Sequence, residues 1–410
     1  MSEQKRNVPK LRFPGFTDAW EQRKLGEVAK IVGGGTPSTS IPEYWNGDID
    51  WYSPTEIGDS VYAEGSRKRI TKSGFQACSA TMLPAERTIL FTSRAGIGNM
   101  AILRRSGCTN QGFQSLVVDD CNDTYFIYSM GDSIKEYAER NASGSTFLEI
   151  SGKQLACMST MVPSLSEQAL IGSFFRDLDD LITLHQRKLD HLKLQKRGLL
   201  QKMFPRDGSD GPEIRFPGFT DAWEQRKLGE LCSFAKGRGY SKADICDSGV
   251  PLILYGRLYT QYQARIDDVD TFAVEREGSL FSCGNEVIVP ASGETAEDIA
   301  VASSVRRSGI VLGGDLNVLT PGLDLDPDYV ALVITYGKTH SELAKRAQGK
   351  SVVHIHNDDI AAIDFSYPTA REQRAISSLA LSFDDLITLH QRKLDHLKLQ
   401  KKALLQQMFI

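Results

Sequence analysis

The chain has 410 residues, enough for two or three domains that each bury a core of their own. With 41% hydrophobic residues, 24% charged residues and a formal net charge of −4, it has the composition of an ordinary globular protein. These values exclude a disordered chain and a strongly basic protein that coats nucleic acid without selectivity.

Localisation and redox state follow from three further features. No apolar run reaches the ~18 residues of a membrane span. The residues after Met1 are polar and resemble no secretory signal, so we expect a cytoplasmic protein. The seven cysteines form no Cys-x-x-Cys pair, which favours reduced thiols over disulfides or a zinc site.

Two segments of the chain occur twice. Residues 12–27 are identical to residues 215–230, and residues 179–196 are identical to residues 384–401. The inserts between these repeats, residues 28–163 and 231–368, show no comparable identity to each other. We interpret this order as two shared frameworks that present two different surfaces to two different targets. Plain duplication with drift is the alternative, but drift would have blurred the frameworks as well.

Each insert is followed by the start signal of a helix. Ser164-x-x-Glu167 and Thr369-x-x-Glu372 are capping boxes, each directly after a proline. Apolar residues then recur at spacings of three and four, which predicts helices of about 40 residues and roughly 60 Å. The residues of this seam are Leu178, Ile182, His185, Leu189, Leu192, Leu199 and Met203, and in the copy Phe383, Ile387, His390, Leu394, Leu397, Leu404 and Met408.

A lone helix of this length with one apolar seam needs a partner. Both helices begin with aspartates and end with lysines and arginines, so antiparallel pairing sets opposite charges side by side and suits each helix dipole. We interpret the basic ends as solvated faces in preference to DNA contacts. The predicted fold is therefore α+β, with two mostly-β modules joined by an antiparallel coiled coil with an approximate two-fold axis. The predicted domains are residues 1–163, the helix 164–206, residues 207–368 and the helix 369–410.

The inserts are rich in short β-branched and aromatic runs between turn residues, which predicts strands. In the first insert we expect strands at 88–93, 99–103 and 114–118. In the second we expect them at 251–254, 285–289, 299–302 and 329–334.

The sequence offers no catalytic apparatus. Gly349-Lys350-Ser351 lacks the leading glycine of a P-loop, because Ala344 stands at that position. The motifs of nucleotide binding, amino-methyl transfer and serine hydrolysis are missing as well. His354 and His356 share a predicted strand face but have no third ligand nearby, which favours ordinary polar residues over a metal site. We predict no catalytic and no metal-binding residues.

Several segments together resemble the specificity subunit of type I restriction-modification systems. They are the paired openings RFPGF, GGGTPS at 33–38, YWNGDIDWYSPTEI at 44–57, TNQGFQSLVV at 109–118 and the helix ending LLQKMF. The resemblance implies two target recognition domains that each read one half of a split DNA sequence. It also implies two modification subunits that use S-adenosylmethionine, restriction subunits that use ATP and Mg²⁺, and no cofactor on this chain.

Bases are read in the major groove by side chains that donate or accept hydrogen bonds in pairs. Polar residues in or beside glycine-rich turns are the candidates, because loops on a rigid sheet can project them. They are Thr36, Ser38, Arg94, Asn110, Gln111 and Gln114 in the first insert, and Arg238, Tyr240, Lys242, Arg257, Ser292, Asn317 and Lys350 in the second. For each one, a turn-stabilising or solvated role is the alternative. Trp45 and Trp51 are expected to be core or interface aromatics in preference to stacking platforms.

Two other functions stay open from the residues alone. A coiled-coil adaptor could use the two modules to bind proteins instead of DNA. A self-contained methyltransferase or nuclease would need a cofactor site, and the sequence shows none.

Overall fold

The computed structural model describes residues 7–410 except 59, 95, 145–147, 207–208, 210 and 350–351. The chain forms two compact units. Unit 1 comprises Met1–His185 with Lys393–Ile410, and unit 2 comprises Gln186–Arg392. The two longest helices, α6 (Leu165–Met203) and α12 (Ala370–Met408), each contribute one part to each unit. Among the described residues, no helix is both long and apolar enough to cross a membrane.

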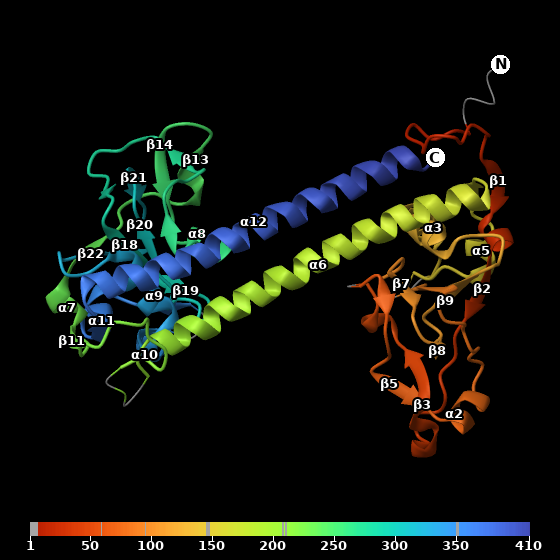
Figure 1. Ribbon diagram of the computed structural model, residues 1–410, viewed down its shortest axis with the longest axis horizontal. Coiled ribbons are helices and arrows are strands. Elements are labelled where there is room, and N and C mark those ends of the chain that lie inside the picture. Colours follow the sequence, from red (N-terminus) through yellow and green to blue (C-terminus); the bar gives the residue numbers. More distant parts are fainter. Residues whose placement is uncertain are drawn as a thin grey trace. The chain divides into compact units, whose positions relative to one another are not determined.

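Unit 1 is built on a five-stranded sheet with the order β2-β9-β6-β7-β4 and a three-stranded sheet with the order β5-β3-β8. Strands β3 and β5 lie farther from α6 than the large sheet does (Figure 1). The strands are β1 (Glu21–Lys24), β2 (Ala29–Gly33), β3 (Trp45–Tyr52), β4 (Tyr62–Ala63), β5 (Lys68–Ile70), β6 (Thr88–Phe91), β7 (Met100–Leu103), β8 (Gly107–Thr109), β9 (Gln114–Val118) and β10 (Ser159–Val162). The shorter helices are α1 (Leu25–Val28), η1 (Pro42–Tyr44), η2 (Pro54–Glu56), α2 (Lys72–Gln76), α3 (Thr124–Ser129), α4 (Gly131–Asn141) and α5 (Gly152–Ala156).

Unit 2 has a five-stranded sheet with the order β12-β22-β18-β20-β15 and a second one with the order β13-β16-β14-β21-β17. Its strands are β11 (Glu224–Lys227), β12 (Cys232–Lys236), β13 (Ile245–Cys246), β14 (Val250–Ile253), β15 (Arg265–Ile266), β16 (Phe272–Ala273), β17 (Phe281–Cys283), β18 (Glu286–Pro290), β19 (Ser292–Gly293), β20 (Ser303–Val305), β21 (Ser308–Leu312), β22 (Leu316–Pro321), β23 (Val353–His354) and β24 (Asp364–Tyr367). Its shorter helices are α7 (Leu228–Leu231), η3 (Lys242–Asp244), α8 (Arg257–Thr260), α9 (Pro327–Tyr336), α10 (Lys338–Arg346) and α11 (Asn357–Ala361).

The two inserts share one topology although their sequences differ. Within the first five-stranded sheet of each unit, three pairings are antiparallel and the short edge strand, β4 or β15, is parallel to its neighbour. In the second sheet, which has three strands in unit 1 and five in unit 2, β3 runs parallel to β8, as β14 runs parallel to β21. In both units the repeated opening pairs antiparallel with the end of its insert, β1 with β10 and β11 with β24. Repetition of the fold therefore extends well beyond the repeated sequence.

Two predicted strands of the second insert are wrong. Residues 299–302 form a buried loop, and the strand begins only at Ser303. Residues 329–334 lie inside α9, where all of them are buried. A fully buried helix carries no amphipathic period, so its short apolar run looks like a strand. Its start signals were Asp326, whose side chain accepts from the Tyr329 N–H at 3.0 Å, and Pro327 in the first turn.

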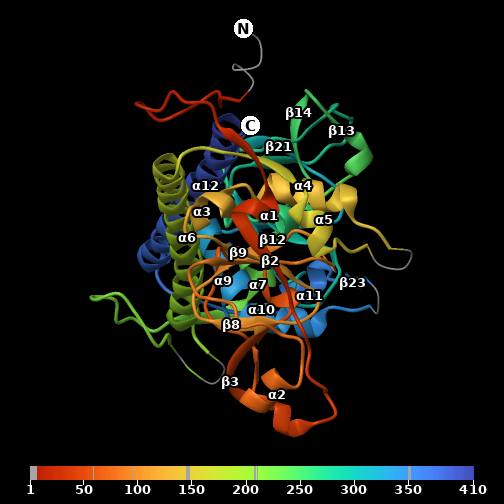
Figure 2. The same cartoon turned by 90° about the vertical axis from the view of Figure 1, so that its right-hand side faces the viewer.

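The long helices run antiparallel to each other within each unit (Figures 1 and 2). In unit 1, Phe409 packs on Phe175 with ring centroids 6.1 Å apart, and Lys401 pairs with Asp179. In unit 2, Leu200 and Met203 share a core with Ile376 and Ala380. All fourteen predicted seam residues are buried or half-buried, whereas leucines on the other faces are exposed, namely Leu181, Leu184, Leu194, Leu386, Leu389 and Leu399.

One lysine in each helix interrupts the seam and finds an aspartate on the other helix. In unit 2 the Lys196 ammonium donates to both carboxylate oxygens of Asp384, at 2.6 and 2.8 Å. In unit 1 Lys401 donates to both oxygens of Asp179, at 2.6 and 2.7 Å. The Asp179 carboxylate also accepts from the Tyr125 hydroxyl at 2.8 Å. These equivalent pairs fix the direction and the register of the helices, because a slipped or parallel pair would leave a buried charge unpaired.

The helix starts differ from the predicted capping boxes: the Glu167 N–H donates to the Ser164 backbone carbonyl at 3.0 Å, and the glutamate side chains bind arginines. Glu167 accepts from the Arg12 guanidinium at 2.6 and 2.7 Å, and Glu372 accepts from Arg215 at 2.7 and 2.8 Å. Both glutamates are 1% exposed. The carboxylates therefore tie the opening repeat to the helix that follows its insert. The same Ser/Thr-x-x-Glu sequence is compatible with a capping box and with this ion pair. The sequence alone therefore could not show which of the two forms.

Replacing Lys196 by methionine should lower the free energy of unfolding by about 1–3 kcal/mol, because the half-buried Asp384 carboxylate would lose its charged partner. Urea unfolding of the full chain measures this. The double variant K196M/D384M should regain most of the loss. The matched control K193M, at an exposed position of α6, should stay within about 0.5 kcal/mol of the unchanged chain. An equal loss in K193M would contradict the interpretation.

Acid should partly rescue the single variant. Burial raises the pKa of Asp384, and Lys196 opposes this effect. Without Lys196, the Asp384 carboxyl binds its proton more tightly in the folded state than in the unfolded state. The free energy of unfolding of K196M therefore rises as the pH falls toward the raised pKa. The gap in stability between K196M and the unchanged chain should therefore be smaller at acidic pH than at neutral pH.

Candidate nucleic-acid interface

The glycine-rich loop after β2 lies directly on the last residue of β8 and the residue that follows it. The Gly35 N–H donates to the Thr109 carbonyl at 2.9 Å. A Cβ atom at Gly34 would lie 1.9 Å from the Asn110 carbonyl oxygen, so only glycine permits this approach of the two backbones. Thr36 and Gln111, both exposed, are thereby brought together, and the Thr36 hydroxyl donates to the Gln111 side-chain oxygen.

Other predicted residues of the first insert surround this contact. The Asn110 side chain is half-buried and accepts from the Gly112 N–H at 2.8 Å. A Cβ atom at Gly112 would lie 3.0 Å from the Asn110 Oδ1 and 3.5 Å from the Arg94 Nε, which places both side chains at the same turn. Arg94 itself stays partly exposed at 3.9 Å from Glu149.

The remaining two residues flank the group. Gln114 is half-buried in β9 opposite Gly33, and Ser38 is exposed, with its hydroxyl 2.8 Å from that of Ser40. Four of the six predicted residues, Thr36, Arg94, Asn110 and Gln111, thus gather at one end of the small sheet.

Two tryptophans hold this loop in place through hydrogen bonds to its backbone. The Trp51 indole N–H donates to the Gly35 carbonyl at 2.9 Å, and Trp51 is 6% exposed. Trp45 packs on it edge to face, with ring centroids 5.1 Å apart, and donates to the Ser38 carbonyl at 3.1 Å. Their role is to hold the loop, as expected of core or interface aromatics.

Unit 2 repeats the loop with other side chains. The Arg238 N–H donates to the Leu312 carbonyl at 3.1 Å, and the Gly314 N–H donates to the Gly239 carbonyl at 2.9 Å. The loop after β12 therefore lies on the residues after β21, as the loop after β2 lies on those after β8. The side chains of Arg238 and Lys242 are exposed here.

Four predicted residues of the second insert are held inside the unit. Tyr240 is buried, and its hydroxyl accepts from the Arg276 N–H at 2.8 Å. Asn317 is fully buried and donates to the Ile355 carbonyl at 2.9 Å, and Ser292 is 7% exposed. Arg257 is mostly buried against Asp270 at 2.6 Å, and its guanidinium lowers the pKa of that carboxyl. Such burial does not fit a contact with a base. Lys350 lies outside the described residues.

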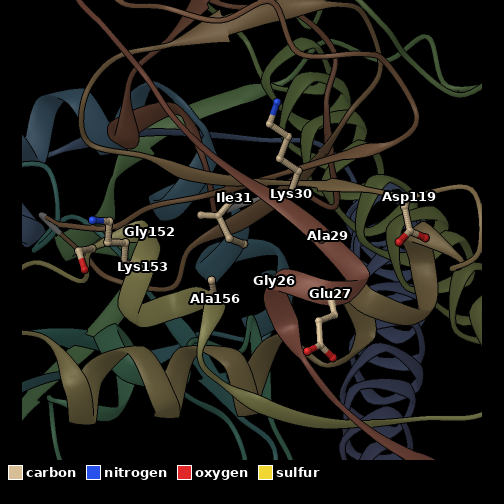
Figure 3. A pocket seen from close by; sticks show the side chains of 10 residues that line it. Gly26, Glu27, Ala29, Lys30, Ile31, Asp119, Gly152, Lys153 and Ala156 are labelled. Carbon is tan, nitrogen blue, oxygen red and sulfur yellow. The ribbon is translucent and has the colours of Figure 1, made fainter.

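A separate cavity of about 770 Å³ lies between α1, β2 and α5 (Figure 3). Its charged side chains are Glu27, Lys30, Asp119 and Lys153, and the first three point in different directions (Figure 3). Catalysis needs groups that converge on one reacting atom, and this cavity has no such convergence. In the part of the chain that the structure describes, no group of three or more His, Cys, Asp or Glu could hold a metal ion.

One exposed basic segment escaped the sequence prediction. Arg67 directly precedes β5, Lys68 and Arg69 are its first two residues, and all three are exposed. Arg69 lies 3.2 Å from Asp50, a buried carboxylate on the neighbouring β3. Three consecutive basic residues in the sequence were the available signal.

Comparison with known proteins identifies the two repeated structures. The model of the type I restriction modification DNA specificity domain matches residues 17–194 and again residues 220–399. The chain belongs to this family. The resemblance inferred from the sequence is thereby confirmed, as is the fold of two recognition domains with two long helices.

Relatives of this family are similar over part or all of the chain. The type I restriction enzyme MjaIX specificity subunit of Methanocaldococcus jannaschii is 30% identical over 236 residues, which are 55% of this chain and 54% of that protein. This match thus spans about half of the relative's length. The MjaVIII specificity subunit of the same organism is 19% identical over 96% of this chain and 92% of its own length. The crystal structure of the S subunit from M. genitalium has the same fold, with a TM-score of 0.65 at 16% identity over 98% of this chain and 99% of that chain.

Replacing Gln111 by alanine should relax base discrimination in the half-site of the first recognition domain only. The loss should be about 1–3 kcal/mol at one base pair, the value of a paired base contact. Binding of the full chain to duplexes that carry each single base change measures this. The control Q400A, at an exposed position of α12, should leave all positions unchanged. Relaxed discrimination in both half-sites would contradict the assignment.

Proposed function

We propose that the chain recognises a bipartite DNA sequence, one half-site with each recognition domain, and directs partner subunits to that site. One observation carries the proposal: two units of the same topology present different polar side chains at equivalent glycine-rich loops. A shared scaffold with unlike loops suits two readers of two different base sequences.

In this proposal the chain binds and orients DNA and performs no chemistry of its own. Two modification subunits would bind S-adenosylmethionine and methylate adenine. Restriction subunits would use ATP and Mg²⁺. The complex would act in the cytoplasm, on the DNA that is present there. The family favours this role over a protein adaptor or a self-contained methyltransferase or nuclease.

Exchange of one insert provides the test. If residues 28–163 are replaced by the corresponding insert of another family member, protection of DNA in a footprint with the modification subunits should change in one half-site and stay in the other. Methylome sequencing of the host reads both half-sites directly. Unchanged half-sites, or tight stoichiometric binding of S-adenosylmethionine by the isolated chain, would overturn the proposal.

Helix length should set the number of unread base pairs between the half-sites. Four residues added at equivalent positions of α6 and α12 lengthen each helix by ~6 Å and turn its end by about 40°. The spacer should change while both half-site sequences stay the same, as methylome sequencing would reveal. The control carries the same four residues in the connection after α6, where helix length is untouched. A changed half-site with the old spacer would refute this role of the helices.

A further inference from the structure

The two inserts share one short segment although they lack extended identity. Residues 104–107 and residues 306–309 both read Arg-Arg-Ser-Gly. In unit 1 the segment follows β7 and ends with the first residue of β8, and in unit 2 it follows β20 and ends with the first two residues of β21. These strands occupy equivalent places in the two topologies. The same four residues therefore recur at the same connection of the fold.

Backbone contacts show that the two segments begin at equivalent positions. The Arg104 N–H donates to the Ala63 carbonyl at 3.1 Å, and the Arg306 N–H donates to the Ile266 carbonyl at 2.9 Å. Both acceptors end the short edge strand of the five-stranded sheet, β4 or β15. The first arginine of each pair is thus tied to the sheet by its backbone.

The second arginine of each pair points to solvent. The Arg105 side chain is 56% exposed and the Arg307 side chain is 50% exposed. Arg105 lies 3.4 Å from Asp50, and Arg307 pairs with Asp268. Each arginine keeps one ion pair that orients it and leaves about half of its side chain available.

The two carboxylates come from different places in the fold. The Asn110 N–H donates to the Tyr52 carbonyl at 3.0 Å, as the Gly313 N–H donates to the Ile253 carbonyl at 2.9 Å. Asp50 therefore corresponds to Pro251 in unit 2, whereas Asp268 follows β15. Because the arginine is shared and its acidic partner is not, the arginine is the common feature and the ion pair is a local solution for holding it.

A residue shared by two readers of different sequences suits a target feature that both half-sites have in common. Phosphate groups are the same at every base step, whereas base edges differ. Arginine matches phosphate geometry with two parallel donors. An identical exposed arginine in two otherwise different readers is thus what phosphate contact requires.

The segment also lies at a suitable distance from the glycine-rich loop. In unit 1 Arg105 stands five residues before Asn110, which is at most about 17 Å of extended chain. In unit 2 Arg307 stands six residues before Gly313, which is at most about 20 Å. The major groove of DNA is ≈ 12 Å wide. If the loop at one end of such a strand enters the groove, an arginine near the other end can therefore reach the DNA phosphates at the edge of the groove.

We propose that Arg105 and Arg307 are the equivalent phosphate contacts of the two recognition domains and position each of them on the DNA backbone beside its half-site. This inference rests on the proposed function and names residues that bind without reading sequence. In unit 1 the exposed basic residues of β5, next to Asp50, extend the same positive surface.

The test uses the full chain with R105Q, R307Q and the double variant. Affinity is measured for a duplex with the target sequence and for a scrambled duplex, over a range of salt concentrations. Each substitution should weaken both duplexes by the same factor and reduce the slope of log K against log [salt] by about one, and the double variant by about two. Preferred bases should stay the same. R105K and R307K should retain the slope, because they retain the charge.

Two exposed arginines away from the segment serve as matched controls. R140Q on α4 and R226Q on β11 remove the same charge from side chains that are 74% and 47% exposed, and they should leave the slope unchanged. A thermal melt of each variant separates loss of folding from loss of contact. If a variant melts early, the lysine version at the same position supplies the comparison.

Three outcomes would overturn the inference. First, R105Q and R307Q could show the same salt dependence of binding as the unchanged chain. If the unchanged chain still prefers the target duplex, this result refutes the inference but not the proposed function. The variants could bind DNA normally but lose a modification subunit, which would assign the arginines to an acidic protein surface. Changed base preference would make them base readers. If the unchanged chain itself does not prefer target over scrambled duplex, the proposed function fails first.

Discussion

A charge buried between two helices can be tolerated only where its partner is placed correctly, and this constraint governs the architecture of the chain. Lys196 with Asp384 and Lys401 with Asp179 admit one direction and one register for α6 and α12 within each unit. An apolar seam alone would permit slippage by a turn at little cost. The hydrophobic residues supply the attraction, and the ion pairs select the arrangement.

The repeated segments close each recognition domain in the same way. Arg12 and Glu167 in unit 1, and Arg215 and Glu372 in unit 2, bind the start of a domain to the helix that follows it. The glutamine after each glutamate also accepts from the N-cap backbone of α3 or α9, at 3.0 and 2.8 Å. Since the insert begins and ends on this frame, its loops are free to vary while the topology stays the same. Variation of recognition is thereby separated from stability.

The sequence predicted the frame far better than the loops. Identical repeats, prolines before the helices and the seam spacing determine α6 and α12 almost completely, because these signals are local. The buried apolar helix α9 was missed, since burial on all sides removes the amphipathic period. Thr36 and Gln111 are far apart in sequence, and composition indicated that both lie by glycine-rich turns but not that they touch. Tyr240 and Asn317 looked the same as the exposed candidates, because burial of a polar side chain depends on partners from distant strands.

The assignment of residues 393–410 to unit 1 has a consequence for biosynthesis. Met408 belongs to the core that also contains Trp20 and Phe126, whereas unit 2 is made of one continuous stretch, residues 186–392. During translation, unit 2 therefore has all its residues before unit 1 does, although unit 1 leaves the ribosome first. Unit 1 is therefore complete only once residues 393–410 have been synthesised. A premature stop before residue 393 would thus damage the recognition domain that is encoded first.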